Sequence, residues 1–237
     1  MSTLDSTQVA NTLRRLFGDM ANDKQRIGEL REKFIKEGLI SPDEDLKQLV
    51  VRLSREDYKA LYTGMLSQLY LAVKPEFGKM LYMLALARNA TNIVEFGTSF
   101  GVSTIHLAAA LRDNGGRGKL ITTEFEPGKV AQAKRNLEEA GLVDLVEFRE
   151  GDAMQTLQTE LPATIDLVLL DGAKNLYVPL LKLLEPRLKR GALVLADNAD
   201  FEPDYLAYVR DPANGYVSLD LALEQGNEMS VRVVDSA

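Results

Sequence analysis

The stretch Asn92-Ile-Val-Glu-Phe-Gly-Thr-Ser-Phe-Gly-Val-Ser-Thr104 decides the fold of this chain. Its first residues are apolar with a β-branched bias, which is typical of a buried strand. Glycines follow at Gly97 and Gly101, and the apolar spacing of residues 102–111 predicts a helix. This order places backbone N–H groups and a helix N-terminus at the carboxyl end of a parallel sheet, where ligands bind. A glycine-containing turn of this kind can also occur without binding any ligand. The residues downstream therefore decide whether this turn is a ligand site or only a connection between strand and helix.

The chain after this stretch repeats the strand–helix pattern. Residues 165–170 are continuously apolar, as expected for a strand that is covered on both faces. Residues 216–223 and 228–233 are typical of a β-hairpin with a turn at 224–227. The sequence therefore predicts a doubly wound α/β fold with a mostly parallel sheet that ends in an antiparallel hairpin. Further strands are expected at 120–123, 145–148 and 192–196, and helices at 75–88, 127–140, 153–158, 175–189 and 203–210.

The first 73 residues have a helical pattern and carry many charges. An apolar stripe begins within residues 9–20, and Ser41-Pro42-Asp43-Glu44 is typical of a helix start. Ser54 is a weaker cap for a helix whose apolar and aromatic spacing predicts burial. These helices either add to the core, cover a ligand cleft or pair with a second subunit. We expect a helical extension at 1–73 that serves as a lid or in a homodimer, and one domain at 74–237.

The composition excludes several classes of protein. The 237 residues are 46% apolar and 27% charged, which is ordinary for a globular protein. A net charge of −7 argues against a general affinity for nucleic acid or an anionic membrane. The absence of cysteine excludes disulfides, thiolate metal sites and cysteine nucleophiles. No signal pattern and no run of roughly 18 apolar residues is found, so we expect a cytoplasmic protein.

Acidic residues end the second and third expected strands. Glu124 is placed to accept hydrogen bonds from both ribose hydroxyls of a nucleoside-containing cofactor. The alternative is a solvent-facing glutamate, since Glu126 follows in the same turn. Asp152 or its loop is placed to meet an adenine edge, although a helix N-cap explains this residue almost as well.

Oxygen-bearing side chains follow the fourth and fifth strands. Asp171 ends one of them and Asp197-Asn198 ends the other. Because these strands should be neighbours, we expect the three side chains to converge, and two carboxylates and an amide oxygen suit a hard cation such as Mg²⁺. Lys174 would then lie beside the cation, which disfavours its ammonium form and suits a general base. The alternative is a surface lysine that starts a helix.

Four segments taken together resemble the cation-dependent, S-adenosylmethionine-using O-methyltransferases, a family that includes the catechol and caffeoyl-CoA O-methyltransferases. The resemblance runs from about Lys74 to Val233. It implies a seven-stranded class I methyltransferase sheet, S-adenosylmethionine and a divalent cation as cofactors, and methyl transfer to a small ortho-dihydroxy aromatic acceptor. The segments are Val94-Glu-Phe-Gly-Thr-Ser-Phe-Gly-Val-Ser103, Ile121-Thr-Thr-Glu-Phe-Glu-Pro127, Leu170-Asp-Gly-Ala-Lys-Asn-Leu-Tyr177 and Gly191-Ala-Leu-Val-Leu-Ala-Asp-Asn198.

The resemblance also implies the roles of individual residues. Lys174 matches the catalytic base, and Glu228 is placed like the acid that orients the second hydroxyl of the substrate. Ala173 stands where catechol enzymes often carry a bulky aromatic residue, so we expect a roomier acceptor pocket. The implied metal ligands are Asp171, Asp197 and Asn198. The implied cofactor-binding residues are Val73, Glu95, Gly97, Ser99, Ser103, Glu124, Phe125, Asp152, Ala153 and Asp171.

Other interpretations stay open. A metal-independent methyltransferase that acts on another oxygen or nitrogen acceptor would share the cofactor residues. An NAD-type oxidoreductase would share the glycine turn and the distant acid, although hydride transfer does not require the paired acids. A binding or assembly protein on this fold would have no reason to hold two carboxylates together at a buried edge. His106, the only histidine, is interpreted as a packed helix residue outside the site.

Overall fold

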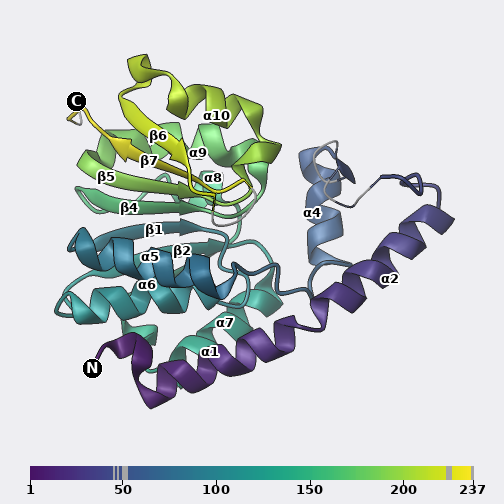
Figure 1. The fold of residues 1–237 in the computed structure, drawn as a ribbon, viewed down its shortest axis with the longest axis horizontal. Helices are drawn as coiled ribbons and strands as arrows, with labels where there is room; N and C mark the ends of the chain where they lie inside the picture. The colour runs from purple at the N-terminus through teal and green to yellow at the C-terminus, as the bar shows by residue number, and fades with distance from the viewer. Residues whose placement is uncertain (45, 47, 50–52, 223–225, 236–237) are drawn as a thin grey trace.

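The protein is described by a computed structural model that covers residues 1–44, 46, 48–49, 53–222 and 226–235. Within these residues seven strands form one sheet in the order β3-β2-β1-β4-β5-β7-β6 (Figure 1). Strands β1 to β5 run parallel, and β7 pairs antiparallel with β5 and β6, which confirms the predicted α/β fold. The strands are β1 (Asn92–Phe96), β2 (Lys119–Glu124), β3 (Val146–Glu150), β4 (Ile165–Leu170), β5 (Leu188–Ala196), β6 (Tyr216–Asp220) and β7 (Glu228–Arg232).

Helices cover both faces of the sheet because successive strand residues point to opposite sides. Ile93 and Leu167 pack in the core with α5, α6 and α7, whereas Val94 and Val168 pack in the core with α8, α9 and α10. Every residue of β4 is therefore buried, as its continuous apolar run predicted. The helices are α5 (Pro75–Ala87), α6 (Val102–Asp113), α7 (Pro127–Glu139), α8 (Ala153–Thr156), α9 (Tyr177–Leu184) and α10 (Pro203–Arg210).

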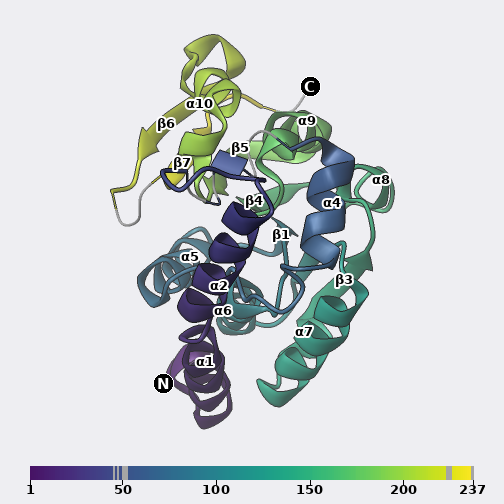
Figure 2. The same ribbon diagram turned by 90° about the vertical axis from the view of Figure 1, so that its right-hand side faces the viewer.

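The N-terminal helices divide into two groups. Helix α1 (Thr7–Met20) adds Val9, Leu13 and Leu16 to the core that contains α5 and α6. Helices α2 (Asp23–Lys36) and α4 (Arg55–Thr63) extend away from the helix layers (Figure 1). We call these helices, the described residues between them and residues 64–66 the arm. Figure 2, viewed from the side of the arm, shows α2 and α4 in front of the sheet. The division of the chain at residue 73 stays a prediction.

The arm has a small hydrophobic core of its own. Phe34, Ile40 and Leu49 are buried together, and neighbouring leucines and isoleucines of the arm pack against them. This cluster is separate from the two cores on the faces of the sheet. None of the helices in the described part of the chain is long and apolar enough to cross a membrane.

Some predicted boundaries were wrong. Residues 41–44 form a turn in which the Glu44 amide donates to the Ser41 carbonyl at 3.0 Å, so no helix begins at Pro42. The helix expected at 175–189 ends at Leu184, since Pro186 lies in a short 3-10 turn and disfavours helix before it. Strand β5 consequently starts earlier than expected. The hairpin residues 223–225 lie outside the described residues.

Candidate active site at the carboxyl edge of the sheet

The glycine turn after β1 brings two loops of the sheet edge together. Gly97 has φ +104, a left-handed conformation that a residue with a side chain rarely adopts. A Cβ atom at this position would collide with the carbonyl group of Asp171. The Asp171 amide in turn donates to the Phe96 carbonyl at 2.8 Å. The turn therefore requires glycine because the loop after β4 passes directly against it.

Glu124, at the end of β2, accepts four hydrogen bonds. Its Oε1 accepts from the backbone amides of Phe125 at 2.8 Å and Glu126 at 2.9 Å. Its Oε2 accepts from the Ser99 amide at 2.8 Å and from the Tyr62 hydroxyl at 3.0 Å. The carboxylate is thus fixed in place, and one of its four donors comes from helix α4 of the arm.

The acids that follow β4 and β5 meet at a lysine. Lys174 Nζ lies 3.6 Å from Asp171 Oδ1 and 4.0 Å from Asp197 Oδ2. It also donates a hydrogen bond of 2.7 Å to the Tyr177 hydroxyl, which itself donates to the Asp197 carbonyl at 2.8 Å. Burial and the nearby Asp197 carboxylate raise the pKa of Asp171 well above its usual value. The lysine is therefore held between two acids at the carboxyl edge of the sheet.

The donor set at this edge fits a hard cation. Asp171, Asp197 and Asn198 offer two carboxylates and one amide oxygen, which suit Mg²⁺ or a similar ion with water completing its shell. Asn198 has φ 49, a left-handed conformation that asparagine tolerates better than most residues. Asn227 Nδ2 donates to Asp197 Oδ1 at 2.8 Å and restrains that carboxylate. The described residues contain no cluster of three or more acidic or histidine side chains suited to a metal, so the amide is a necessary part of the set.

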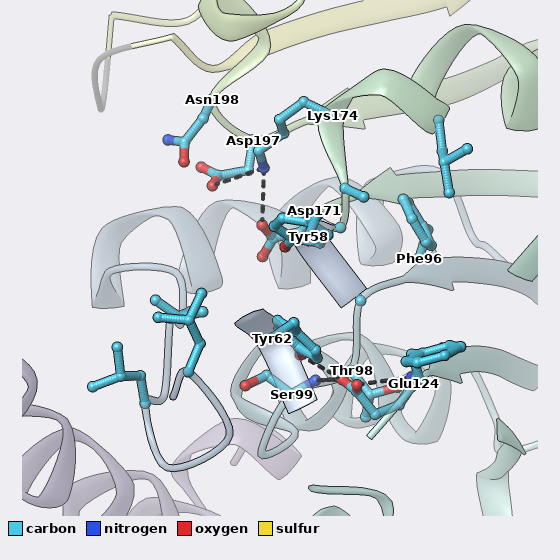
Figure 3. Close-up of a pocket in the computed structure, with 18 of the residues that line it drawn as sticks. Tyr58, Tyr62, Phe96, Thr98, Ser99, Glu124, Asp171, Lys174, Asp197 and Asn198 are labelled. Carbon is cyan, nitrogen blue, oxygen red and sulfur yellow. Dashed lines mark hydrogen bonds and ion pairs between the residues drawn. The ribbon is translucent and has the colours of Figure 1, made fainter. Parts of the chain in front are cut away.

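One cavity of about 480 Å³ joins these groups. Lys174, Asp171, Asp197 and Asn198 lie toward one end of it, and Ser99, Tyr62 and Glu124 lie toward the other (Figure 3). The structure thus brings together most of the residues that the sequence selected. Those that line the cavity are Val73, Gly97, Ser99, Ser103, Glu124, Phe125, Asp152, Ala153, Asp171, Lys174, Asp197 and Asn198.

Comparison with known proteins agrees with this geometry. Residues 94–199 match a family profile described as a methyltransferase domain. The catechol O-methyltransferase of Mycobacterium tuberculosis is 38% identical over 128 residues, which cover 54% of this chain and 57% of that protein. Caffeoyl-CoA O-methyltransferase 2 of Eucalyptus globulus is 30% identical over 161 residues, which cover 65% of this chain and 64% of that protein. Over these parts the chain is similar to catechol and caffeoyl-CoA O-methyltransferases.

A solved member of the wider O-methyltransferase group has the same fold. The O-methyltransferase TomG from Streptomyces achromogenes, in complex with S-adenosylmethionine, superposes with a TM-score of 0.63 at 25% identity. The superposition covers 79% of this chain and 94% of TomG. The sequence matches to the two curated enzymes, in contrast, span less than two thirds of their length.

Two residues that the O-methyltransferase resemblance selected do not line the cavity. Glu95 is fully buried and accepts hydrogen bonds of 2.6 Å from the hydroxyls of Ser103, Thr104 and Thr122. Burial raises the pKa of this carboxyl group, and the three hydroxyl donors oppose that effect. Glu95 therefore holds Ser103, which does line the cavity, whereas Glu95 itself does not, and its contact with the cofactor stays a prediction.

Glu228 lies in a different place from the one expected. Its carboxylate is 1% exposed and accepts from the Arg210 guanidinium at 2.8 and 2.6 Å, and from the Ser218 hydroxyl at 2.6 Å. These contacts fasten α10 to the hairpin, and the role expected for Glu228 at the acceptor stays a prediction. Asn227, the residue before it, is the hairpin residue that reaches the site, through Asp197.

The end of the cavity near Glu124 contains residues that the sequence did not single out for the site. Tyr58 and Tyr62 of α4 line the cavity and stack with ring centroids 5.9 Å apart. Lys129 is fully buried and donates to the Leu69 carbonyl at 2.9 Å, the Tyr62 hydroxyl at 3.2 Å and Ser99 Oγ at 3.3 Å. Burial lowers the pKa of Lys129 to about 8.

Asp152 takes the helix-capping role that the sequence left open as an alternative, and His106 is packed as interpreted from the sequence. Asp152 caps α8, since its Oδ1 accepts from the Met154 amide at 3.0 Å, and its carboxylate also lies 3.7 Å from Lys59 Nζ. His106 is 2% exposed, and its Nδ1 makes a 2.8 Å hydrogen bond with the Val102 carbonyl. His106 is therefore a packed helix residue and not part of the site.

Proposed function

We propose that this chain transfers a methyl group from S-adenosylmethionine to one hydroxyl of an ortho-dihydroxy aromatic acceptor, with the help of a divalent cation. The observation that carries the proposal is the meeting of Lys174 with Asp171 and Asp197 in the same cavity as Glu124. A base, a cation site and a ribose acceptor are the parts that this reaction needs. The similarity to catechol and caffeoyl-CoA O-methyltransferases supports the same conclusion.

The cofactor end of the cavity is proposed to bind and orient S-adenosylmethionine. Glu124 accepts the ribose hydroxyls, while Phe125, Asp152 and Ala153 border the adenine ring. The glycine turn lies beside the methionine part, and Gly97 lets this turn pass directly against the loop after β4. The remaining residues proposed for the methionine part are Val73, Ser99 and Ser103, all of which line the cavity.

Asp171, Asp197 and Asn198 are proposed to hold the cation. When bound, the cation would lower the pKa of a hydroxyl that contacts it, and S-adenosylmethionine would supply an electrophilic methyl group. Lys174 Nζ accepts the proton of the reacting hydroxyl. Tyr177 keeps the lysine in place, because burial and the two acids raise the pKa of its phenol well above the usual value and it stays neutral.

The acceptor oxygen then forms a bond to the methyl carbon. The carbon–sulfur bond breaks at the same time and its electron pair stays on sulfur, which leaves a neutral thioether. Lys174 afterwards releases its proton to water. The cavity walls hold the reacting atoms in line, and positioning of this kind supplies much of the rate. No covalent intermediate with the protein is needed.

The proposal is tested by calorimetric titration with S-adenosylmethionine and by methyl transfer to catechols with and without EDTA. We expect cofactor binding and EDTA-sensitive turnover. Lys174→Met should lower kcat by about 100-fold or more. Lys182→Met, on the adjoining helix over Tyr208, is the matched control and should retain activity. EDTA-insensitive turnover would instead favour a metal-independent methyltransferase, and failure to bind S-adenosylmethionine would refute the proposal.

The homodimer and the cytoplasmic location predicted from the sequence also remain proposals. The described surface offers exposed apolar side chains, among them Met83 at 63% and Val217 at 61%, that a second copy would cover. Light scattering after size exclusion gives the mass of the particle, and a monomer would remove the dimer from the proposal.

A further inference from the structure

The cavity has two unlike ends. The edge of the sheet contributes the acids, the lysine and the backbone groups described above. The arm contributes an apolar wall, and this wall lies on the same continuous cavity as Lys174. Its residues are Ile27, Phe34, Leu46, Leu49, Leu61 and Leu66.

The wall leaves apolar surface uncovered. Ile27 is 36% exposed, and Leu71, which lines the same cavity from the segment leading to Val73, is 42% exposed. Apolar side chains exposed in a concave site gain free energy when an apolar ligand covers them. The arm therefore offers a binding surface that a small, fully polar acceptor would leave empty.

The polar side chains of α4 face the cofactor end instead. Lys59 Nζ lies 3.7 Å from the Asp152 carboxylate and 4.8 Å from the centre of the Phe125 ring. The Tyr62 hydroxyl is bonded to Glu124 at 3.0 Å. Among the described residues that line the cavity, the only other cations are Lys74 and Lys174. The wall is consequently matched to hydrocarbon and not to a phosphate-bearing or carboxylate-bearing group.

We infer that the acceptor is an ortho-dihydroxy aromatic that carries a hydrocarbon substituent, and that this substituent rests on the apolar wall of the arm. The inference depends on the proposed function, since it assigns the substrate class of the same site. The two hydroxyls lie at the Asp171–Asp197 edge, and the substituent extends away from Lys174 toward Ile27 and Leu61. The absence of a bulky side chain at Ala173 leaves space for such a ring substituent beside the base.

The test uses catechols with alkyl groups of increasing length on the ring, and a matched series whose alkyl group ends in a carboxylate. For the full-length protein, kcat/KM should rise about threefold to fourfold with each methylene until the wall is covered. The carboxylate series should show no such rise. A kcat/KM value that stays level or falls as the alkyl chain grows would overturn the inference.

A matched pair of variants locates the effect on the wall. Ile27 and Met65 are each 36% exposed on the arm, but only Ile27 lines the cavity. Ile27→Gln should lower the ratio of kcat/KM for a long-chain catechol to that for catechol by about tenfold, whereas Met65→Gln should leave the ratio unchanged. Equal ratios in the two variants would also overturn the inference.

Binding without turnover separates this inference from the proposed function. The same alkylcatechols are titrated calorimetrically into the protein saturated with S-adenosylhomocysteine. Affinity that grows with chain length, with a negative heat-capacity change, supports the wall even if no catechol is methylated. Affinity that does not depend on chain length contradicts it, whereas absence of turnover alone contradicts only the proposed reaction.

Discussion

Removal of the Tyr62 hydroxyl is expected to tighten cofactor binding. A carboxylate offers about four lone-pair sites on its two oxygens. All four on Glu124 are occupied, three by the backbone amides of Ser99, Phe125 and Glu126 and one by Tyr62. If Glu124 holds the ribose of S-adenosylmethionine, a ribose hydroxyl has to displace one of these donors. Tyr62 is the donor on a side chain, and it belongs to the arm.

The size of the effect follows from that displacement. A hydrogen bond to a charged group contributes about 1.5–3 kcal/mol. Part of this is recovered, because the displaced hydroxyl still contacts Lys129 Nζ at 3.2 Å. Tyr62→Phe should therefore improve the binding of S-adenosylmethionine by about 1–2 kcal/mol, which is about fivefold to thirtyfold in Kd.

The assay is calorimetric titration of the wild type and the variant with S-adenosylmethionine and with S-adenosylhomocysteine. Tyr58→Phe is the control, because its ring stacks on Tyr62 while the four donors to Glu124 do not include it. The control should bind like the wild type. Binding by Tyr62→Phe that is equal to or weaker than that of the wild type would refute the idea that the tyrosine hydroxyl stands where a ribose hydroxyl binds.

Three further outcomes are expected. Tyr177→Phe removes the hydrogen bond that fixes the proposed base, Lys174. The value of kcat should therefore fall about threefold to tenfold, while the Kd for S-adenosylmethionine stays unchanged. A change in Kd without a change in kcat would contradict this prediction. A strained backbone conformation costs about 1–3 kcal/mol. Gly97→Ala should lower the free energy of unfolding, measured in urea, by more than this cost, because its Cβ also meets the Asp171 carbonyl. Gly115 has φ +100 and no atom near its Cβ position, so Gly115→Ala should show the cost of the strained backbone alone. Equal losses of stability in the two variants would exclude the collision with the Asp171 carbonyl. Burial lowers the pKa of His106 from 6.5 to about 4, so the unfolded chain takes up a proton that the folded chain does not. The free energy of unfolding should therefore fall by about 2 kcal/mol as the pH is lowered from about 7 to about 5. His106→Gln should remove this part of the pH dependence, and an unchanged pH dependence in the variant would contradict the prediction.

The sheet and its acidic edge were predictable because local pattern and topology determine them. A continuous apolar run such as 165–170 leaves little choice but a strand covered on both faces. Parallel strands end at one edge, so Asp171 and Asp197 meet once β4 and β5 are neighbours. Glycine at Gly97 marked the turn for the same local reason, a backbone conformation that other residues rarely adopt.

The remaining contacts depend on segments far apart in the chain. Lys129 lies in the first turn of a helix, where a lysine is ordinarily exposed, and it is buried because Leu69 and Tyr62 come to it from the N-terminal region. Glu228 could face either side of a hairpin strand, and Arg210 of α10 decides which. Glu95 was expected to face a ligand, but hydroxyls from α6 and β2 surround it.

The separate core of the arm has a consequence for how this protein can change over generations. Phe34, Ile40 and Leu49 are packed apart from both cores on the sheet. A substitution among them alters the free energy of the arm and leaves the sheet and its acidic edge as they were. Selection can therefore remodel the surface proposed to select the acceptor while the groups proposed to bind the methyl donor are inherited intact. In this chain, the proposed selection of the acceptor depends on the arm and the proposed methyl transfer depends on the edge of the sheet, so the two can evolve at different rates.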